Sequence, residues 1–74
     1  MAELTIAFEK DDEVKVTKSG LKTVGSQKTV PKGTTGAVLE YHIVWGETAY
    51  LVKLDSNGLN GELIKALESQ LDNA

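Results

Sequence analysis

A tight turn runs directly into an apolar strand at Pro31-Lys32-Gly33-Thr34-Thr35-Gly36-Ala37-Val38-Leu39-Glu40. Proline presets the backbone angle of one turn residue, and glycine accepts backbone angles that other residues resist. Of the two glycines, Gly36 is expected to need either a positive φ or close packing. The segment predicts how the chain bends, and it carries no catalytic signature.

Alternation of apolar and polar residues predicts strands on both sides of this turn. The predicted strands cover residues 3–8, 14–17, 37–45 and 48–54. The last two are expected to form a hairpin through Gly46-Glu47, with Tyr50, Val52 and Leu54 on one face. β-branched and aromatic residues are concentrated in this hairpin, as is typical of paired strands.

The segment 62–71 fits two structures. As a helix, it places Leu63, Ile64, Leu67 and Leu71 in one apolar stripe among good helix formers. Alternatively, residues 62–67 form a final strand, and the next four residues form a tight turn that inserts Leu71 into the end of a barrel. Local propensity favours the helix, whereas the gain from closing a small sheet on itself favours the strand.

Length and composition predict one small domain. The chain has 74 residues and no cysteine, so neither a disulfide framework nor a thiolate metal site is available to it. We expect a single domain over 1–74 with its core at about 3–72. The first residues resemble no signal peptide, and no segment approaches the ~20 apolar residues that span a bilayer. A soluble, cytoplasmic protein without membrane contact is expected.

The lysines are unevenly distributed in a chain whose formal net charge is −3. Five of the eight lie between Val14 and Leu39, where no acidic residue occurs: Lys15, Lys18, Lys22, Lys28 and Lys32. The chain has no arginine, the residue best suited to bidentate recognition of phosphate or guanine. We expect residues 18–32 to form a long basic loop that docks an acidic surface of another protein. The alternative is that solubilising lysines collect in an exposed loop.

Four motifs follow one another along the chain. They are Asp12-Glu13-Val14-Lys15-Val16, Pro31-Lys32-Gly33-Thr34-Thr35-Gly36-Ala37-Val38, Ala49-Tyr50-Leu51-Val52-Lys53-Leu54 and Leu67-Glu68-Ser69-Gln70-Leu71. In this order they resemble the small SH3-like barrels, which include the KOW-type modules and several short bacterial proteins. The resemblance covers roughly residues 10–72 and implies an all-β or mainly β barrel of about five strands, with or without a short C-terminal helix or helical turn. Asp11 replaces the usual glycine of the first motif, and Ala66-Leu67 replaces the proline of the last.

No constellation typical of an enzyme is present. His42 is the only histidine, and the serines stand in no G-x-S-x-G pattern. Asp11, Asp12 and Glu13 are better explained as a solvated turn than as a general acid and base. We expect neither catalysis nor a metal or other cofactor.

The aromatic residues Tyr41, Trp45 and Tyr50 fall on one predicted hairpin and are expected to meet across it. Either they form the core and its cover, or an exposed Trp45 anchors a partner protein, since aromatic side chains dominate interface energies.

Two functions of different classes follow. The favoured one is a non-catalytic protein-interaction module or small accessory subunit. Its expected binding residues are Lys18, Lys22, Lys28, Lys32, Tyr41 and Trp45. The alternative is a KOW-like module that binds nucleic acid or a ribonucleoprotein, with lysines along phosphates and an aromatic ring on a base. The acidic net charge and the lack of arginine disfavour it. The sequence also leaves open a phage or mobile-element protein with another role.

Overall fold

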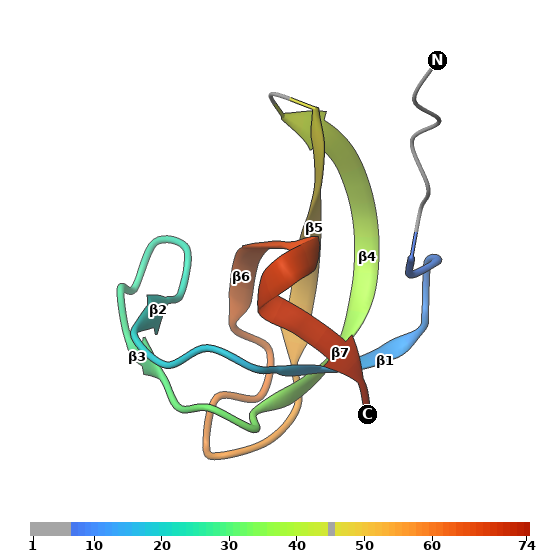
Figure 1. Cartoon of the computed structure of the whole chain (residues 1–74). Coiled ribbons are helices and arrows are strands. Elements are labelled where there is room, and N and C mark those ends of the chain that lie inside the picture. The colour runs from blue at the N-terminus through green and yellow to red at the C-terminus, as the bar shows by residue number, and fades with distance from the viewer. Residues whose placement is uncertain (1–6, 45) are drawn as a thin grey trace.

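The computed structural model describes residues 7–44 and 46–74, which form seven strands and one short 3-10 helix. The elements are β1 (Glu13–Val16), β2 (Leu21–Lys22), β3 (Thr29–Val30), β4 (Thr35–Val44), β5 (Glu47–Leu54), β6 (Leu63–Leu67), η1 (Glu68–Gln70) and β7 (Leu71–Asn73). Five strands form an antiparallel sheet in the order β6-β5-β4-β1-β7, and β2 pairs with β3 alone (Figure 1). The predicted mainly β fold is confirmed.

The β4–β5 hairpin is the longest paired element, as the sequence predicted. Tyr41 lies opposite Tyr50, and Val38 lies opposite Val52. The register shifts between Val38 and Glu40, so that Leu39 is an extra residue on β4. The predicted inward face of β5 is confirmed, because Tyr50, Val52 and Leu54 are all buried.

The helix interpretation of 62–71 is wrong, and the alternative of a strand followed by a turn is confirmed. β6 pairs with β5 along its whole length, which buries Ile64 and Ala66 and leaves Lys65 exposed. Pairing with a neighbouring strand outweighs local helix propensity here. In η1, the Gln70 side chain accepts a hydrogen bond from the Leu67 amide (2.9 Å), and the chain then inserts Leu71 into the core.

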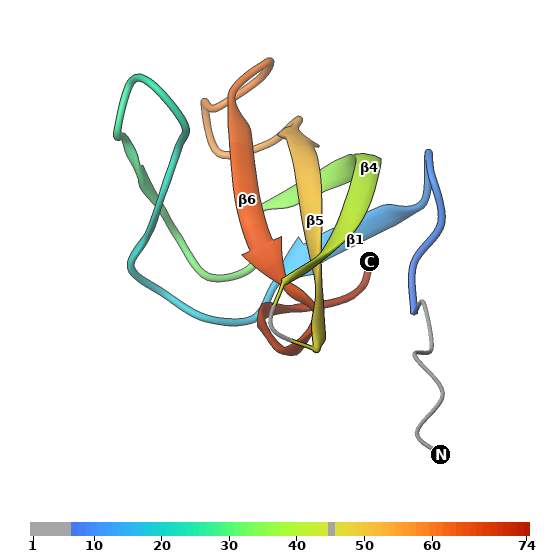
Figure 2. The same ribbon diagram turned by 90° about the horizontal axis from the view of Figure 1, so that it is seen from above.

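The 3-10 turn links the two ends of the five-stranded sheet, since β6 precedes it and β7 follows it (Figures 1 and 2). Within residues 7–44 and 46–74, no ladder pairs β6 with β7. The same residues include no helix of the length and apolarity needed to cross a membrane.

The strand predicted at 3–8 lies mostly outside the described residues. Ala7 and Phe8 are described, and they belong to no strand. Phe8 is nevertheless buried, with its ring at 5.2 Å from that of Tyr50 in an edge-on arrangement. The Ala7 amide donates a hydrogen bond to the Tyr50 hydroxyl at 3.0 Å. The segment therefore contributes a packing residue where a strand was expected.

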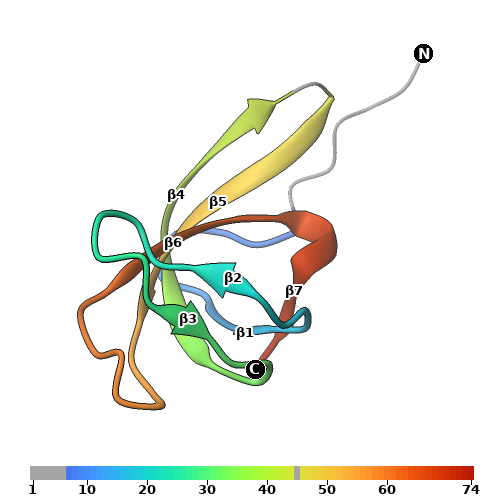
Figure 3. The same cartoon turned by 90° about the vertical axis from the view of Figure 1, so that its left-hand side faces the viewer.

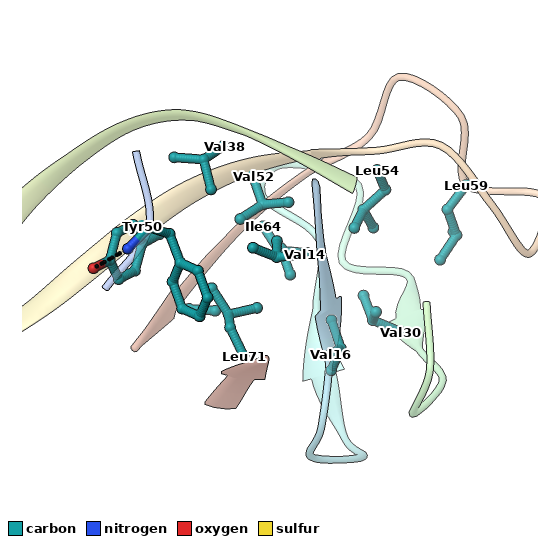
Figure 4. Close-up of a cluster of buried hydrophobic side chains, with 12 residues drawn as sticks. Val14, Val16, Val30, Val38, Tyr50, Val52, Leu54, Leu59, Ile64 and Leu71 are labelled. Atoms are coloured by element: carbon teal, nitrogen blue, oxygen red, sulfur yellow. Dashed lines mark hydrogen bonds between the residues drawn. The ribbon is translucent and has the colours of Figure 1, made fainter. Parts of the chain in front are cut away.

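The core lies between the curved sheet and the segments that cross it (Figure 4). Val14 and Val16 of β1 point into it, which confirms the alternation predicted for 14–17. Just before β1, Asp11 has a φ of 74° and its amide donates to the Val38 carbonyl at 2.7 Å. A positive φ favours glycine, and aspartate tolerates that conformation better than most other residues do.

Close packing, not a positive φ, is the reason for glycine at position 36. A Cβ atom on Gly36 would lie 2.5 Å from the Lys53 carbonyl oxygen and 2.8 Å from Cγ1 of Val52. The residue pairs with Val14 of β1 on one side and with Leu54 of β5 on the other, so neither neighbouring strand can move away without breaking pairs.

Gly36→Val is expected to lower the free energy of unfolding by about 1–3 kcal/mol, since overpacking forces the backbone apart. Ala37→Val is the matched control, because Ala37 is the next residue of β4 and points to the opposite, partly exposed face. Denaturant unfolding of both variants tests this, and equal stability of Gly36→Val and the wild type would contradict the packing argument.

Candidate functional site

The predicted basic loop at 18–32 is a short hairpin, called the lysine hairpin below (Figure 3). Leu21 pairs with Val30, and Lys22 pairs with Thr29. Gly20 and Gly25 have positive φ values at the two bends of this segment. Two apolar residues attach the segment to the body, since Val30 is fully buried in the core and Leu21 packs against the core.

Backbone and side-chain hydrogen bonds hold the lysine hairpin against the main sheet. The Val24 amide donates to the Leu63 carbonyl of β6 at 2.7 Å. Thr23 is buried, and its hydroxyl accepts a hydrogen bond from the Lys28 amide at 2.8 Å. The hairpin therefore covers part of the outer edge of β6 and is fixed in position by it.

Glu62 is the polar anchor of the hairpin. It accepts hydrogen bonds from the Ser26 hydroxyl at 2.8 Å and from Lys28 Nζ at 3.1 Å. These two hydrogen bonds lower the pKa of the Glu62 carboxyl below its ordinary value, and the bond from Ser26 has the larger effect. Lys28 thus forms an ion pair within the molecule while its side chain stays 54% exposed, and its role in partner binding stays a prediction.

The other three predicted lysines are exposed. Lys22 Nζ donates to the Thr29 hydroxyl across the hairpin at 2.6 Å. Lys18 and Lys32 stand at the base, where the Val16 amide donates to the Thr34 carbonyl and the Gly33 amide to the Val16 carbonyl. These bonds hold the two chains at the base together, so Lys18 and Lys32 project from neighbouring, ordered segments.

The predicted aromatic part of the site lies elsewhere. Tyr41 is 45% exposed on β4, and its ring centroid is 6.4 Å from that of Tyr50. The expected pairing across the hairpin is confirmed for these two rings, and Tyr50 belongs to the core. Trp45 lies outside the described residues. The lysine hairpin and the end of the β4–β5 hairpin project from different parts of the molecule (Figures 1 and 3), so one surface does not unite them.

Two apolar residues are exposed that the sequence analysis did not place among the candidate binding residues. Ile43 is 50% exposed on β4, and Val24 is 56% exposed near the tip of the lysine hairpin. The register shift at Leu39 places Tyr41 and Ile43 on the same face as Tyr50 and Thr48. No pattern in the sequence marks a bulge at this position.

One pair of carboxyl groups lies apart from the lysine hairpin. The pKa of the Glu13 carboxyl is raised. Loss of solvent around the group is the larger cause, and the neighbouring Asp55 carboxyl is the second. Asp55 also accepts a hydrogen bond from the Thr35 hydroxyl at 2.7 Å. The described residues contain neither a pocket at this pair or elsewhere nor a cluster of three potential metal ligands.

Acid is expected to loosen the lysine hairpin. Because folding lowers the Glu62 pKa, the stability it contributes is present above the ordinary value of 4.5 and is lost as the pH falls through the lower folded value. At neutral pH, Glu62→Gln should therefore reduce the hydrogen-exchange protection of the Val24 amide, and the difference from wild type should vanish in acid. Glu9→Gln, on an exposed residue outside the hairpin, is the control. Equal protection of wild type and Glu62→Gln at neutral pH would refute the anchor.

Comparisons with known proteins were made for sequence families, for curated proteins and for solved structures. No family model, no curated protein and no solved structure matches this chain. The similarity to the small SH3-like barrels stays a prediction made from the sequence motifs.

Proposed function

We propose that this chain is a non-catalytic protein-interaction module of the SH3-like type, whose lysine hairpin docks an acidic surface of another protein. The proposal depends on one observation: the lysine-rich segment is anchored to the sheet, at Leu63 and Glu62, and is not a free loop. Anchoring fixes its charges before binding, so less conformational entropy is lost when a partner docks.

The arrangement of charge supports an acidic protein as the partner. Lys18, Lys22 and Lys32 are exposed, and the only carboxylate bonded to the hairpin within the described residues is that of Glu62, which Lys28 and Ser26 already occupy. Complementary charge at an interface raises association rates and selects partners.

A nucleic acid is the less favoured ligand. Neutralising several phosphates requires a longer basic stripe, and phosphate contacts make binding strongly dependent on salt. The exposed aromatic residue that the structure describes, Tyr41, lies on the other hairpin, so the lysines and a stacking ring are not combined in one groove.

Lys18→Glu/Lys32→Glu is expected to abolish capture of an acidic protein by the immobilised chain from an extract of its source cells. Lys10→Glu/Lys15→Glu is the matched control, because it changes the net charge equally on exposed residues outside the hairpin. The measurement is quantitative capture with and without nuclease. Proteins lost only with the hairpin variant and insensitive to nuclease support the proposal. Equal capture by both variants, or losses that nuclease reproduces, would contradict it, and the second result would favour nucleic acid.

A further inference from the structure

The β4–β5–β6 sheet has a second face, which points away from the core and carries both apolar and charged residues. Three rows of paired residues cross it, each with one residue from β4, β5 and β6. The rows are Ala37, Lys53 and Leu63; Glu40, Leu51 and Lys65; and His42, Ala49 and Leu67. The alternate residues Val38, Val52 and Ile64 point into the core, so these three rows form the opposite face, called the outer face below.

A solvent-facing side of an antiparallel sheet is ordinarily polar. Here Glu40, Lys53 and Lys65 are exposed as expected, but Leu51, Leu63 and Leu67 are only half-buried and add apolar surface between the charges. Leu63 and Leu67 of β6 are the two diagonal neighbours of Leu51 on β5, and Lys65 stands between them along β6. Apolar area of this kind with charged residues at its sides marks an interaction surface.

The charges on the outer face have an ordered arrangement. In the central row, Lys65 on β6 and Glu40 on β4 flank Leu51 on β5. With a strand spacing of roughly 4.8 Å, their Cα atoms are about 10 Å apart. Neither takes part in an ion pair within residues 7–44 and 46–74, where the pair found is that of Lys28 with Glu62. One side of the leucine is therefore basic and the other side acidic.

We propose that the outer face binds a second copy of this chain, with a two-fold axis that runs along β5 past Leu51. A two-fold axis between two packed faces lies in the plane of contact and exchanges the two sides of the face. It places Leu51 on Leu51 of the other copy, and it places Lys65 of each copy opposite Glu40 of the other.

The charges of the central row disfavour the other orientation. An axis across the strands would oppose Lys65 to Lys65 and Glu40 to Glu40, and like charges in contact are unfavourable. A second copy of the chain is acidic where this copy is basic, so the charges favour it as the binding partner. They also favour one direction of packing over the other.

Lys53 limits the strength of the contact. It lies on β5 in the row next to Leu51, so the axis brings it near Lys53 of the second copy. The three rows on three strands also cover less than the ~800 Å² per partner of a standard interface. We therefore expect a weak dimer, and Lys53→Gln should strengthen it.

The test is sedimentation velocity of the whole chain over a range of concentrations, with each variant's unfolding curve recorded to establish that it folds. Wild type should pass from monomer to dimer below about 1 mM, the upper limit of weak specific association. Leu51→Glu should remove the dimer, whereas Ile43→Glu, on the exposed part of the opposite face, should leave it unchanged.

A charge exchange separates this dimer from any other contact. Glu40→Lys and Lys65→Glu alone should each weaken dimerisation by about tenfold, because both place like charges opposite one another. An equimolar mixture of the two variants should dimerise as wild type does, since each contact then joins opposite charges again. A wild type that stays monomeric throughout, a dimer that Leu51→Glu leaves intact, or a mixture no better than its separate components would overturn the proposal. None of these outcomes bears on the lysine hairpin, whose residues are unchanged.

Discussion

The fold depends on the close approach of β4 to β5 at Gly36. No side chain separates the two backbones there, and the position also pairs with β1, so three strands meet at one residue. Val14, which pairs with Gly36, packs in the same core as Val52 and Ile64 (Figure 4). A chain this short buries only about 60% of its unfolded surface, and it depends on such a contact to enclose a core at all.

The sequence was sufficient for elements whose pattern is local. The β4–β5 hairpin, β1 and the burial of Tyr50, Val52 and Leu54 follow from alternation and β-propensity. The C-terminal segment was ambiguous because the same leucines fit a helix and a strand, and only pairing with β5 distinguishes the two. Such pairing is a contact between distant parts of the chain, which local propensity does not encode.

The candidate surfaces were harder to predict for the same reason. Lys28 looked equivalent to its neighbouring lysines in sequence, yet its partner Glu62 is 34 residues away. The outer face also escaped notice, because Leu51, Leu63 and Leu67 each fit an ordinary strand and become neighbours on one face only through the register of β5 with β6. The charge segregation between Val14 and Leu39 was visible, but which of these exposed lysines forms an ion pair depends on the fold.

The lysine hairpin connects the two proposals. An open strand edge invites pairing with another chain, and the bond from the Val24 amide to the Leu63 carbonyl occupies part of the edge of β6. This bond makes part of the β6 edge unavailable to a second copy and leaves the outer face beside it free for the proposed contact. The hairpin can then present Lys18 and Lys32 beyond the edge while the outer face packs elsewhere. A dimer of this kind would carry two lysine hairpins, so a partner with two acidic patches would bind more tightly than the single contact allows, because its second contact becomes intramolecular.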